Sequence, residues 1–191
     1  MKYRIKLTQL ITVILLVIAK PADWTLFTIG MLLAFAGEGI RVWASGNLKK
    51  DKNLAINGPY RMVRNPLYVG SFLMSIGLAV TCINAQYPWR SVALFAVILL
   101  GFKYIYRLQV QAEEIHLTNL FGADFENFKK TVPPYMPKLC KFGEAMEHNS
   151  FEWPQVVYNK ELTTISGVVI IGALLALEIY LGKYLGDLLH F

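Results

Sequence analysis

Polar side chains gather around one proline-started helix in residues 58–70, and their chemistry suits the binding of an anion. Pro66 fits the first turn of a helix, because its missing N–H costs nothing there. The N–H groups that follow it point out of the helix start, where they favour a negatively charged group. Tyr60, Asn65 and Tyr68 add hydrogen-bonding side chains around the same helix end. This cluster predicts a site for a polar ligand that carries an anion.

Two further sets of charged residues could border that site. The adjacent carboxylates Glu113 and Glu114 follow Arg107 by about one and a half helical turns. Neighbouring helical residues project about 100° apart, so we expect at most one of the two to enter a given pocket; a solvated acidic helix is the alternative. Glu38 and Arg41, three residues apart, are expected to pair on one helical face. That pair is either structural or borders a polar site.

The elements that must position these residues are apolar. Of 191 residues, 55% are hydrophobic and 17% are charged, whereas soluble domains usually carry about a quarter charged residues. At about 1.5 Å per residue, the apolar runs measure roughly 22 to 32 Å, against about 30 Å for a hydrocarbon core. These runs are residues 5–19, 24–44, 67–83, 91–106 and 162–181. The predicted fold is an all-α integral membrane bundle of about five transmembrane helices.

The distribution of Lys and Arg predicts the orientation of this bundle. With five spans, the N-terminus and the loops 45–66 and 107–160 share one side and carry fourteen of the nineteen basic residues. The positive-inside rule places them, and the candidate site with them, in the cytoplasm. A signal peptide is the alternative for the first run, but it lacks a good small-x-small cleavage site. Residues 1–44 are therefore interpreted as a transmembrane hairpin.

The stretch after the fourth run has its own organisation. A helix over 109–121 is expected to continue that span beyond the bilayer, Gly122 ends it, and a short helix follows over 123–131. Residues 132–137 are expected to be extended, because each proline disfavours helix at the residue before it. Residues 138–160 are expected to form a polar, irregular connector.

Two motifs together resemble a known family. The pattern GPYxxxRNPxYxG at 58–70 is similar to the G-x-Y-x-x-x-R-H-P-x-Y-x-G motif of the isoprenylcysteine carboxyl methyltransferases. The patterns EExxxxxxFGxxFxxFK at 113–129 and VPxxxP at 132–137 resemble that family's acidic helix and closing segment. The similarity covers about residues 30–139. Asn65, where that family has His, also resembles the related phospholipid methyltransferases of the same superfamily of integral membrane methyltransferases.

This resemblance implies a membrane enzyme that transfers a methyl group from S-adenosylmethionine to a lipid or another lipophilic acceptor. A helix start suits the carboxylate of this cofactor, and Glu113 suits its ammonium group or a hydroxyl. No catalytic base and no metal are assigned, because the sulfonium is already a good electrophile and catalysis is mainly positioning. The implied cofactor contacts are Lys52, Asn53, Leu54, Ala55, Tyr60, Asn65, Pro66, Leu67, Tyr68 and Glu113.

Departures from the family pattern bear on the acceptor. Asn65 keeps hydrogen bonding but cannot titrate as the family's His does. Gln109 stands where that family has an Arg that contacts the prenylcysteine, which argues against a carboxylate acceptor and for a lipid headgroup or a small lipophilic molecule. Arg107 lies within one turn of Gln109 and is an alternative source of that charge. Arg107, Gln109 and Glu114 are therefore the candidates for substrate contact.

The predicted domains are a transmembrane hairpin at 1–44, a methyltransferase core at 45–139, and a polar connector with an extra transmembrane helix at 140–191. A sterol-reductase-like oxidoreductase using NADPH and a non-enzymatic membrane scaffold are the alternatives with this architecture. Nucleic-acid binding is not expected, because the basic residues lie beside spans and form no separate domain. Cys82 and Cys140 are too few and too isolated for a disulfide framework or a cysteine-based zinc site.

Overall fold

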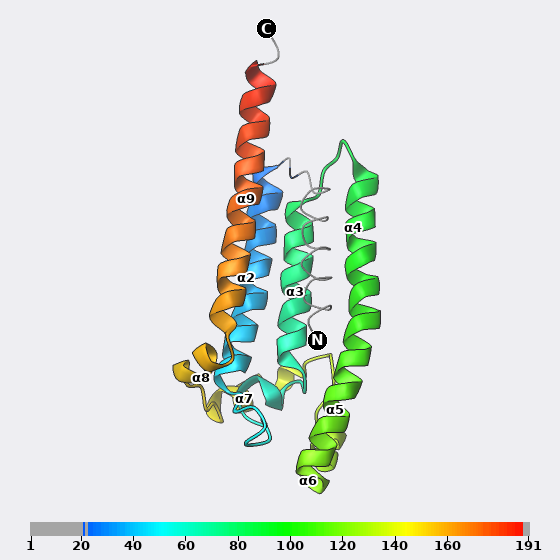
Figure 1. The fold of residues 1–191 in the computed structure, drawn as a ribbon, viewed down its shortest axis with the longest axis vertical. Coiled ribbons are helices and arrows are strands. Elements are labelled where there is room, and N and C mark those ends of the chain that lie inside the picture. Colours follow the sequence, from blue (N-terminus) through cyan, green and yellow to red (C-terminus); the bar gives the residue numbers. More distant parts are fainter. Residues whose placement is uncertain (1–20, 22, 189–191) are drawn as a thin grey trace.

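The computed structural model describes residues 21 and 23–188, and every regular element in them is helical. The long helices α9 (Glu161–Leu188), α2 (Trp24–Gly46), α3 (Pro66–Thr81) and α4 (Pro88–Gly101) stand side by side in that order (Figure 1). The expected first span, residues 5–19, lies outside the described residues.

Three of the described helices are long and apolar enough to cross a membrane. They are α2, the continuous helix Pro88–Phe121, and α9 over Glu161–Gly182, whereas α3 is apolar but shorter. In the second of these, a π-helical turn (Phe102–Tyr106, labelled η2) joins α4 to α5 (Arg107–Phe121) without a break. The all-helical membrane fold is confirmed, and the fourth span continues into the next helix as expected. The total of five spans stays a prediction.

Small residues bring α2 and α3 into close contact. A Cβ added at Gly37 would lie 2.5 Å from the backbone nitrogen of Met74, and one at Gly70 would lie 2.5 Å from the carbonyl oxygen of Gly37. Gly30 makes a similarly close approach to Gly77 further along the pair. Small residues allow such backbone contact between membrane helices. The first turn of α3, where the predicted site lies, is therefore held against α2.

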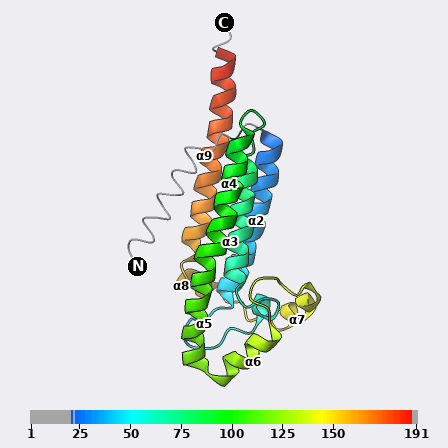
Figure 2. The ribbon, with the colours of Figure 1, turned by 90° about the vertical axis from the view of Figure 1, so that its right-hand side faces the viewer.

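The short elements lie at the end of the bundle away from the α3–α4 connection (Figure 2). Gly122, with a φ of 53°, separates α5 from α6 (Ala123–Thr131), and residues 132–137 contain no helix. The break at Gly122, the short helix after it and the lack of helix over 132–137 were predicted correctly, but the chain bends at residues 132 and 134–136 and is not extended throughout, as had been expected. The other elements at this end are η1 (Gly58–Arg61), η3 (Leu139–Lys141), α7 (Phe142–Glu147) and α8 (Trp153–Tyr158).

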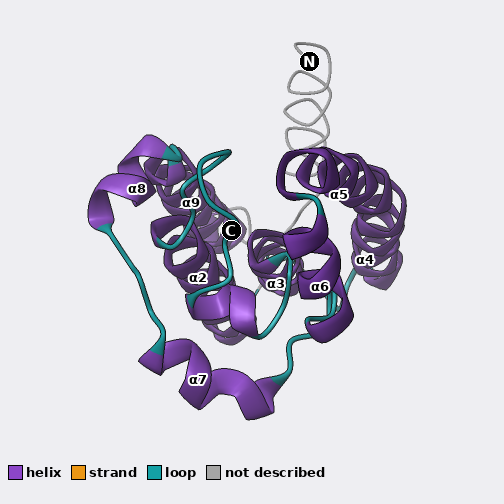
Figure 3. Ribbon diagram, turned by 90° about the horizontal axis from the view of Figure 1, so that it is seen from below, coloured by secondary structure: helices purple, strands orange, loops and turns teal. Residues whose placement is uncertain are grey.

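The prediction of an irregular connector over 138–160 was wrong. This segment forms η3, α7 and α8, because local backbone bonds such as His148 N to Glu144 O close single helical turns. Pro154 occupies the first turn of α8, where a proline is tolerated. Seen from below, α7 lies beside the bundle, while α8 adjoins the start of α9 (Figure 3). The connector thus returns the chain to the bundle as a series of short helices.

Candidate active site

A cavity of about 630 Å³ lies between the loop before α3, the first turn of α3, and the helices α5 and α6. We call it the polar cavity. Most of the predicted cofactor residues line it: Asn53, Leu54, Ala55, Tyr60, Asn65, Pro66, Leu67, Tyr68 and Glu113. Lys52 does not: it is exposed, while its neighbours Asp51 and Asn53 line the cavity. The structure therefore brings together two sets of residues that are about fifty positions apart in the sequence.

The start of α3 differs from the expected anion site. Helix α3 begins at Pro66 as predicted. The N–H groups of Tyr68 and Val69, however, donate to the Asn65 carbonyl at 3.1 and 3.2 Å. Pro66 has no N–H, so fewer amides remain for a ligand than the sequence suggested. The Asn65 side chain donates to the carbonyl of Pro134 at 3.0 Å, and this bond ties the segment after α6 to the start of α3.

Both carboxylates of α5 line the polar cavity, contrary to the expectation that at most one would do so. Glu113 accepts a hydrogen bond from the Tyr68 hydroxyl at 3.0 Å. Glu114 forms an ion pair with Arg64, 3.2 Å from Nη2 to Oε1. Glu113 and Glu114 project about 100° apart on α5, yet both can line the cavity. Each has its own partner on the opposite wall: Tyr68 for Glu113 and Arg64 for Glu114. The wall opposite α5 thus has one polar partner for each carboxylate.

Two buried polar atoms on this wall, Tyr60 Oη and Arg64 Nε, lack a hydrogen-bond partner within the described part of the chain. Tyr60 is only 6% exposed, and burial, together with the negative charges of Glu113 and Glu161, raises the pKa of its hydroxyl. The phenol therefore stays neutral and able to donate. Since an unsatisfied buried polar group costs about 1–3 kcal/mol, these atoms fit a cavity that receives a polar ligand.

A second cavity, of about 640 Å³, adjoins the first. We call it the apolar cavity, since side chains of α3, α4–α5 and the segment after α6 give it a largely apolar wall. These residues are Val69, Phe72, Phe102, Val110, Pro134, Tyr135, Met136 and Pro137. Lys103 and Arg107 also line it, and Arg64, Tyr68 and Glu114 line both cavities. The two cavities therefore meet at these three residues.

The three substrate-contact candidates are placed differently. Gln109 lines the polar cavity, Arg107 lines the apolar cavity, and Glu114 lies where the two meet. Arg107 therefore does not take the place of Gln109, as the sequence had allowed. Arg64 was not predicted as a site residue, although its position inside the GPYxxxRNPxYxG motif was an available signal.

The expected Glu38–Arg41 pair is present, with 3.7 Å between Arg41 Nε and Glu38 Oε2. A closer partner of Arg41 is Glu161 of α9, at 2.6 Å from Nη2, which the sequence did not indicate. Arg41 itself lines the polar cavity. Within the residues that the structure describes, no group of three or more His, Cys, Asp or Glu side chains is placed to hold a metal ion.

Comparison with known proteins identifies relatives of the chain. The human protein-S-isoprenylcysteine O-methyltransferase is 32% identical over 130 residues, 62% of this chain and 43% of that protein. The nickel-cobalt-cadmium resistance protein NccN of Alcaligenes xylosoxydans xylosoxydans is 29% identical over 119 residues, 61% of this chain and 52% of that protein. The cobalt-zinc-cadmium resistance protein CzcN of Cupriavidus metallidurans is 30% identical over 129 residues, which are 66% of this chain and 55% of that protein.

The chain spans about half the length of the curated relatives it matches. No solved structure matched it. A family model described as phospholipid methyltransferase matches residues 24–124, which include α2 to α5 and most of the polar-cavity wall. These matches favour the methyltransferase interpretation and give no support to the reductase or scaffold alternatives. The chain belongs to the phospholipid methyltransferase family.

Proposed function

We propose that this protein is an S-adenosylmethionine-dependent methyltransferase that acts on an amphiphilic acceptor in the membrane. The observation that carries the proposal is the meeting of a polar and an apolar cavity at Arg64, Tyr68 and Glu114. A methyl transfer of this kind needs a charged cofactor and a lipophilic acceptor bound next to each other. Each cavity suits one of the two.

The residues of the polar cavity fit the cofactor. Glu113 and Tyr68 would meet its ammonium group or ribose hydroxyls, and the cofactor would give the neutral Tyr60 hydroxyl a partner that it lacks among the described residues. Phe121, Phe125 and Phe128 offer an apolar wall suited to adenine. When bound, S-adenosylmethionine supplies a methyl group on a positively charged sulfur. The protein's part is to orient the two reactants and exclude water, which lowers the barrier without a catalytic base.

The apolar cavity fits the tail of the acceptor. Its aromatic and aliphatic wall suits a hydrocarbon chain, while Arg64, Lys103 and Arg107 add positive charge. Gln109, which stands where the family has an arginine, lines the polar cavity. Its lack of charge therefore does not remove positive charge from the apolar cavity. The acceptor class we propose is therefore a molecule with an apolar tail and an acidic group, either a lipid headgroup or a lipophilic acid.

Binding and turnover of the purified protein test this function. In detergent, S-adenosylhomocysteine should bind by calorimetry and NADPH should not; binding of NADPH alone would contradict the proposal. Turnover is then measured with methyl-labelled cofactor and three acceptors: phosphatidylethanolamine, an S-farnesyl-cysteine analogue and total membrane lipid. Labelling of the farnesyl-cysteine acid alone would identify a lipophilic acid as the acceptor. Labelling of phosphatidylethanolamine would identify a lipid headgroup.

The orientation is part of the proposal. Both walls of the polar cavity should face the cytoplasm, because the loops that form them hold most of the basic residues. Cysteines introduced at the exposed positions 52 and 119, in a Cys140→Ser background, should react with an impermeant thiol reagent only from the cytoplasmic side. Cys82 is buried and can remain in place. Labelling of the two positions from opposite sides would contradict a shared cavity.

A further inference from the structure

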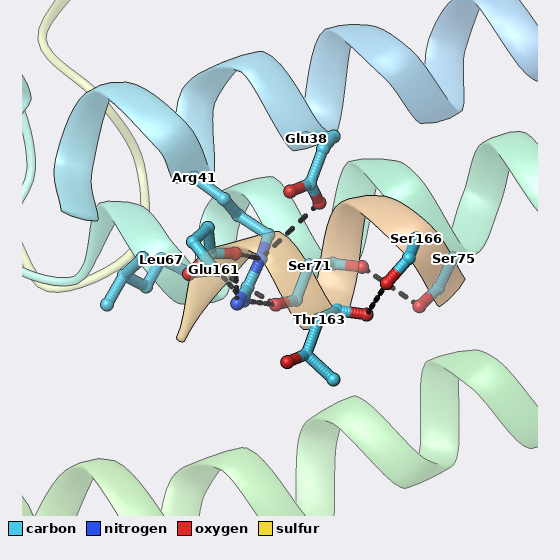
Figure 4. A network of polar contacts seen from close by, with 8 residues as sticks. All are labelled: Glu38, Arg41, Leu67, Ser71, Ser75, Glu161, Thr163 and Ser166. Atoms are coloured by element: carbon cyan, nitrogen blue, oxygen red, sulfur yellow. Dashed lines mark hydrogen bonds and ion pairs between the residues drawn. The ribbon is translucent and has the colours of Figure 1, made fainter. Parts of the chain in front are cut away.

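One partly buried arginine joins three helices beside the polar cavity. Arg41 of α2 donates from Nε to Glu161 Oε1 of α9 at 2.7 Å, and its Nη2 lies 2.6 Å from the same oxygen. Its Nη1 donates to the Leu67 carbonyl of α3 at 3.3 Å and to the Ser71 hydroxyl. Figure 4 shows these groups pointing toward one another. The guanidinium thus holds the start of α3 and the start of α9 together.

The charge of Arg41 is paired mainly with the buried carboxylate of Glu161. Glu161 is 3% exposed, and the side chain of Arg41 is 16% exposed. Charges this poorly solvated persist only when they are paired and hydrogen-bonded. Glu38, the other carboxylate near Arg41, lies further away at 3.7 Å, and neither of its oxygens has a hydrogen-bond partner among the described residues. Glu161 is therefore the main anchor of the guanidinium.

The contacts on α3 link this anchor to the cavity. Leu67 and Ser71 both line the polar cavity, as does Arg41 itself. Arginine is suited to this task because its planar guanidinium spreads five N–H donors over three nitrogens, whereas a lysine has all its donors on one nitrogen. A loss of Glu161 would free the guanidinium to rotate and would loosen its bonds to Leu67 and Ser71.

The segment that leads into α9 supports the same region. Asn159 donates to the carbonyls of Ser45 and Leu48 at 3.0 and 2.9 Å, where α2 ends and the cavity loop begins. Both Asn159 and Glu161 lie beyond residue 124, where the family match ends. The part of the chain outside the match therefore contacts two walls of the cavity.

We infer that Glu161 is a positioning residue of this protein: acting through Arg41, it fixes the first turn of α3 in the wall of the polar cavity. The C-terminal helix thus contributes to the site without touching a ligand. This inference rests on the proposed function in one respect, since the cavity it shapes is the proposed cofactor cavity.

Hydrogen exchange in the ligand-free protein tests the positioning without any cofactor. In Glu161→Gln, amide exchange over residues 65–71 should rise about two- to thirtyfold, the range expected when a coupled contact is lost. Exchange over residues 123–131 of α6 should not change. The control is Glu147→Gln, an exposed carboxylate of the same C-terminal part, which should leave both segments as in the wild type. Unchanged exchange over 65–71 in Glu161→Gln would overturn the inference.

Ser71→Ala keeps the test decisive if Glu161→Gln fails to fold. It retains the Arg41–Glu161 pair and removes one bond from Arg41 to α3, so amide exchange over residues 65–71 should still rise. An unchanged exchange rate would overturn the inference.

Affinity for S-adenosylhomocysteine is the second readout. It should fall about two- to thirtyfold in Glu161→Gln and in Arg41→Lys, and no further in the double variant, because both changes act through one guanidinium. Additive losses of affinity in the double variant would show that Glu161 does not act through Arg41, and would overturn the inference.

Failure of the proposed function would look different. A wild-type protein that binds no S-adenosylhomocysteine would overturn the cofactor proposal, while the exchange over residues 65–71 would still decide whether Glu161 positions α3.

Discussion

The two cavities of this protein have nearly the same volume but differ in how many charged and polar side chains line them. The polar cavity, about 630 Å³, is lined by Glu113, Glu114, Arg64 and Tyr60, whose hydroxyl has no hydrogen-bond partner among the described residues. The apolar cavity, about 640 Å³, is walled mostly by aliphatic and aromatic side chains. Three side chains, those of Arg64, Tyr68 and Glu114, line both cavities. Under the proposed function, each cavity would select one reactant by solvation, and the shared residues would set the distance between the two reactants.

The largest effect is expected at the junction itself. Arg64→Met removes the partner of Glu114 and a wall residue of both cavities, so methyl transfer should fall by about a hundredfold, or about 2.7 kcal/mol. Turnover with saturating cofactor and acceptor measures it. Arg61→Met is the matched control, because Arg61 pairs with Glu144 at 3.6 Å and lines neither cavity. Equal losses in both variants would show that the junction has no special role.

A change confined to the polar cavity should affect the cofactor alone. Glu113→Gln removes a charge-assisted bond, so affinity for S-adenosylhomocysteine should fall about tenfold, or about 1.5 kcal/mol. We take the lower end of the usual range because Glu113 is exposed. Calorimetry measures the affinity. Glu114→Gln should change it less, because that carboxylate is already paired with Arg64; the reverse order would assign the cofactor contact to Glu114.

A change confined to the apolar cavity should affect the acceptor alone. Val69→Phe adds volume to its wall, so the KM for the lipidic acceptor should rise about fivefold, while affinity for S-adenosylhomocysteine stays within about twofold. Leu108→Phe is the control, since Leu108 is 55% exposed and lines neither cavity. Weaker cofactor binding in Val69→Phe would mean that the two cavities do not select their ligands separately.

The smallest effect is expected at Tyr60, where one substitution should raise the stability of the protein and lower its affinity for the cofactor product. Tyr60→Phe removes a buried hydroxyl without a described partner, so unfolding should become harder by about 1 kcal/mol, a rise in Tm of about 2–4 °C. Affinity for S-adenosylhomocysteine should nevertheless fall about two- to tenfold. Because burial raises the pKa of Tyr60, its hydroxyl stays protonated and the loss should be the same from about pH 6 to 9. A loss that vanished at higher pH within this range would contradict a neutral donor.

Much of the fold was predictable because local chemistry decides it. Gly122 ends α5 through a left-handed φ, Pro66 starts α3, and the prolines of 132–137 prevent a helix there. The apolar runs predicted long helices, since hydrocarbon requires each backbone group to bond within its own segment. The short helices η3, α7 and α8 were missed, because single turns in a polar segment leave almost no periodic signal.

The sequence by itself determined part of the polar-cavity wall, because a spaced motif carries the chemistry of its site: apart from Lys52, each predicted cofactor contact lines it. Only the tertiary structure decided how these residues meet. Arg64 and Tyr68 face α5 at two places, so both Glu113 and Glu114 enter one cavity. Arg107 and Gln109 are two positions apart on one helix yet line different cavities. The pairing of Arg41 with Glu161, 120 positions away, depends on how α9 packs against α2, and no local pattern encodes such a contact.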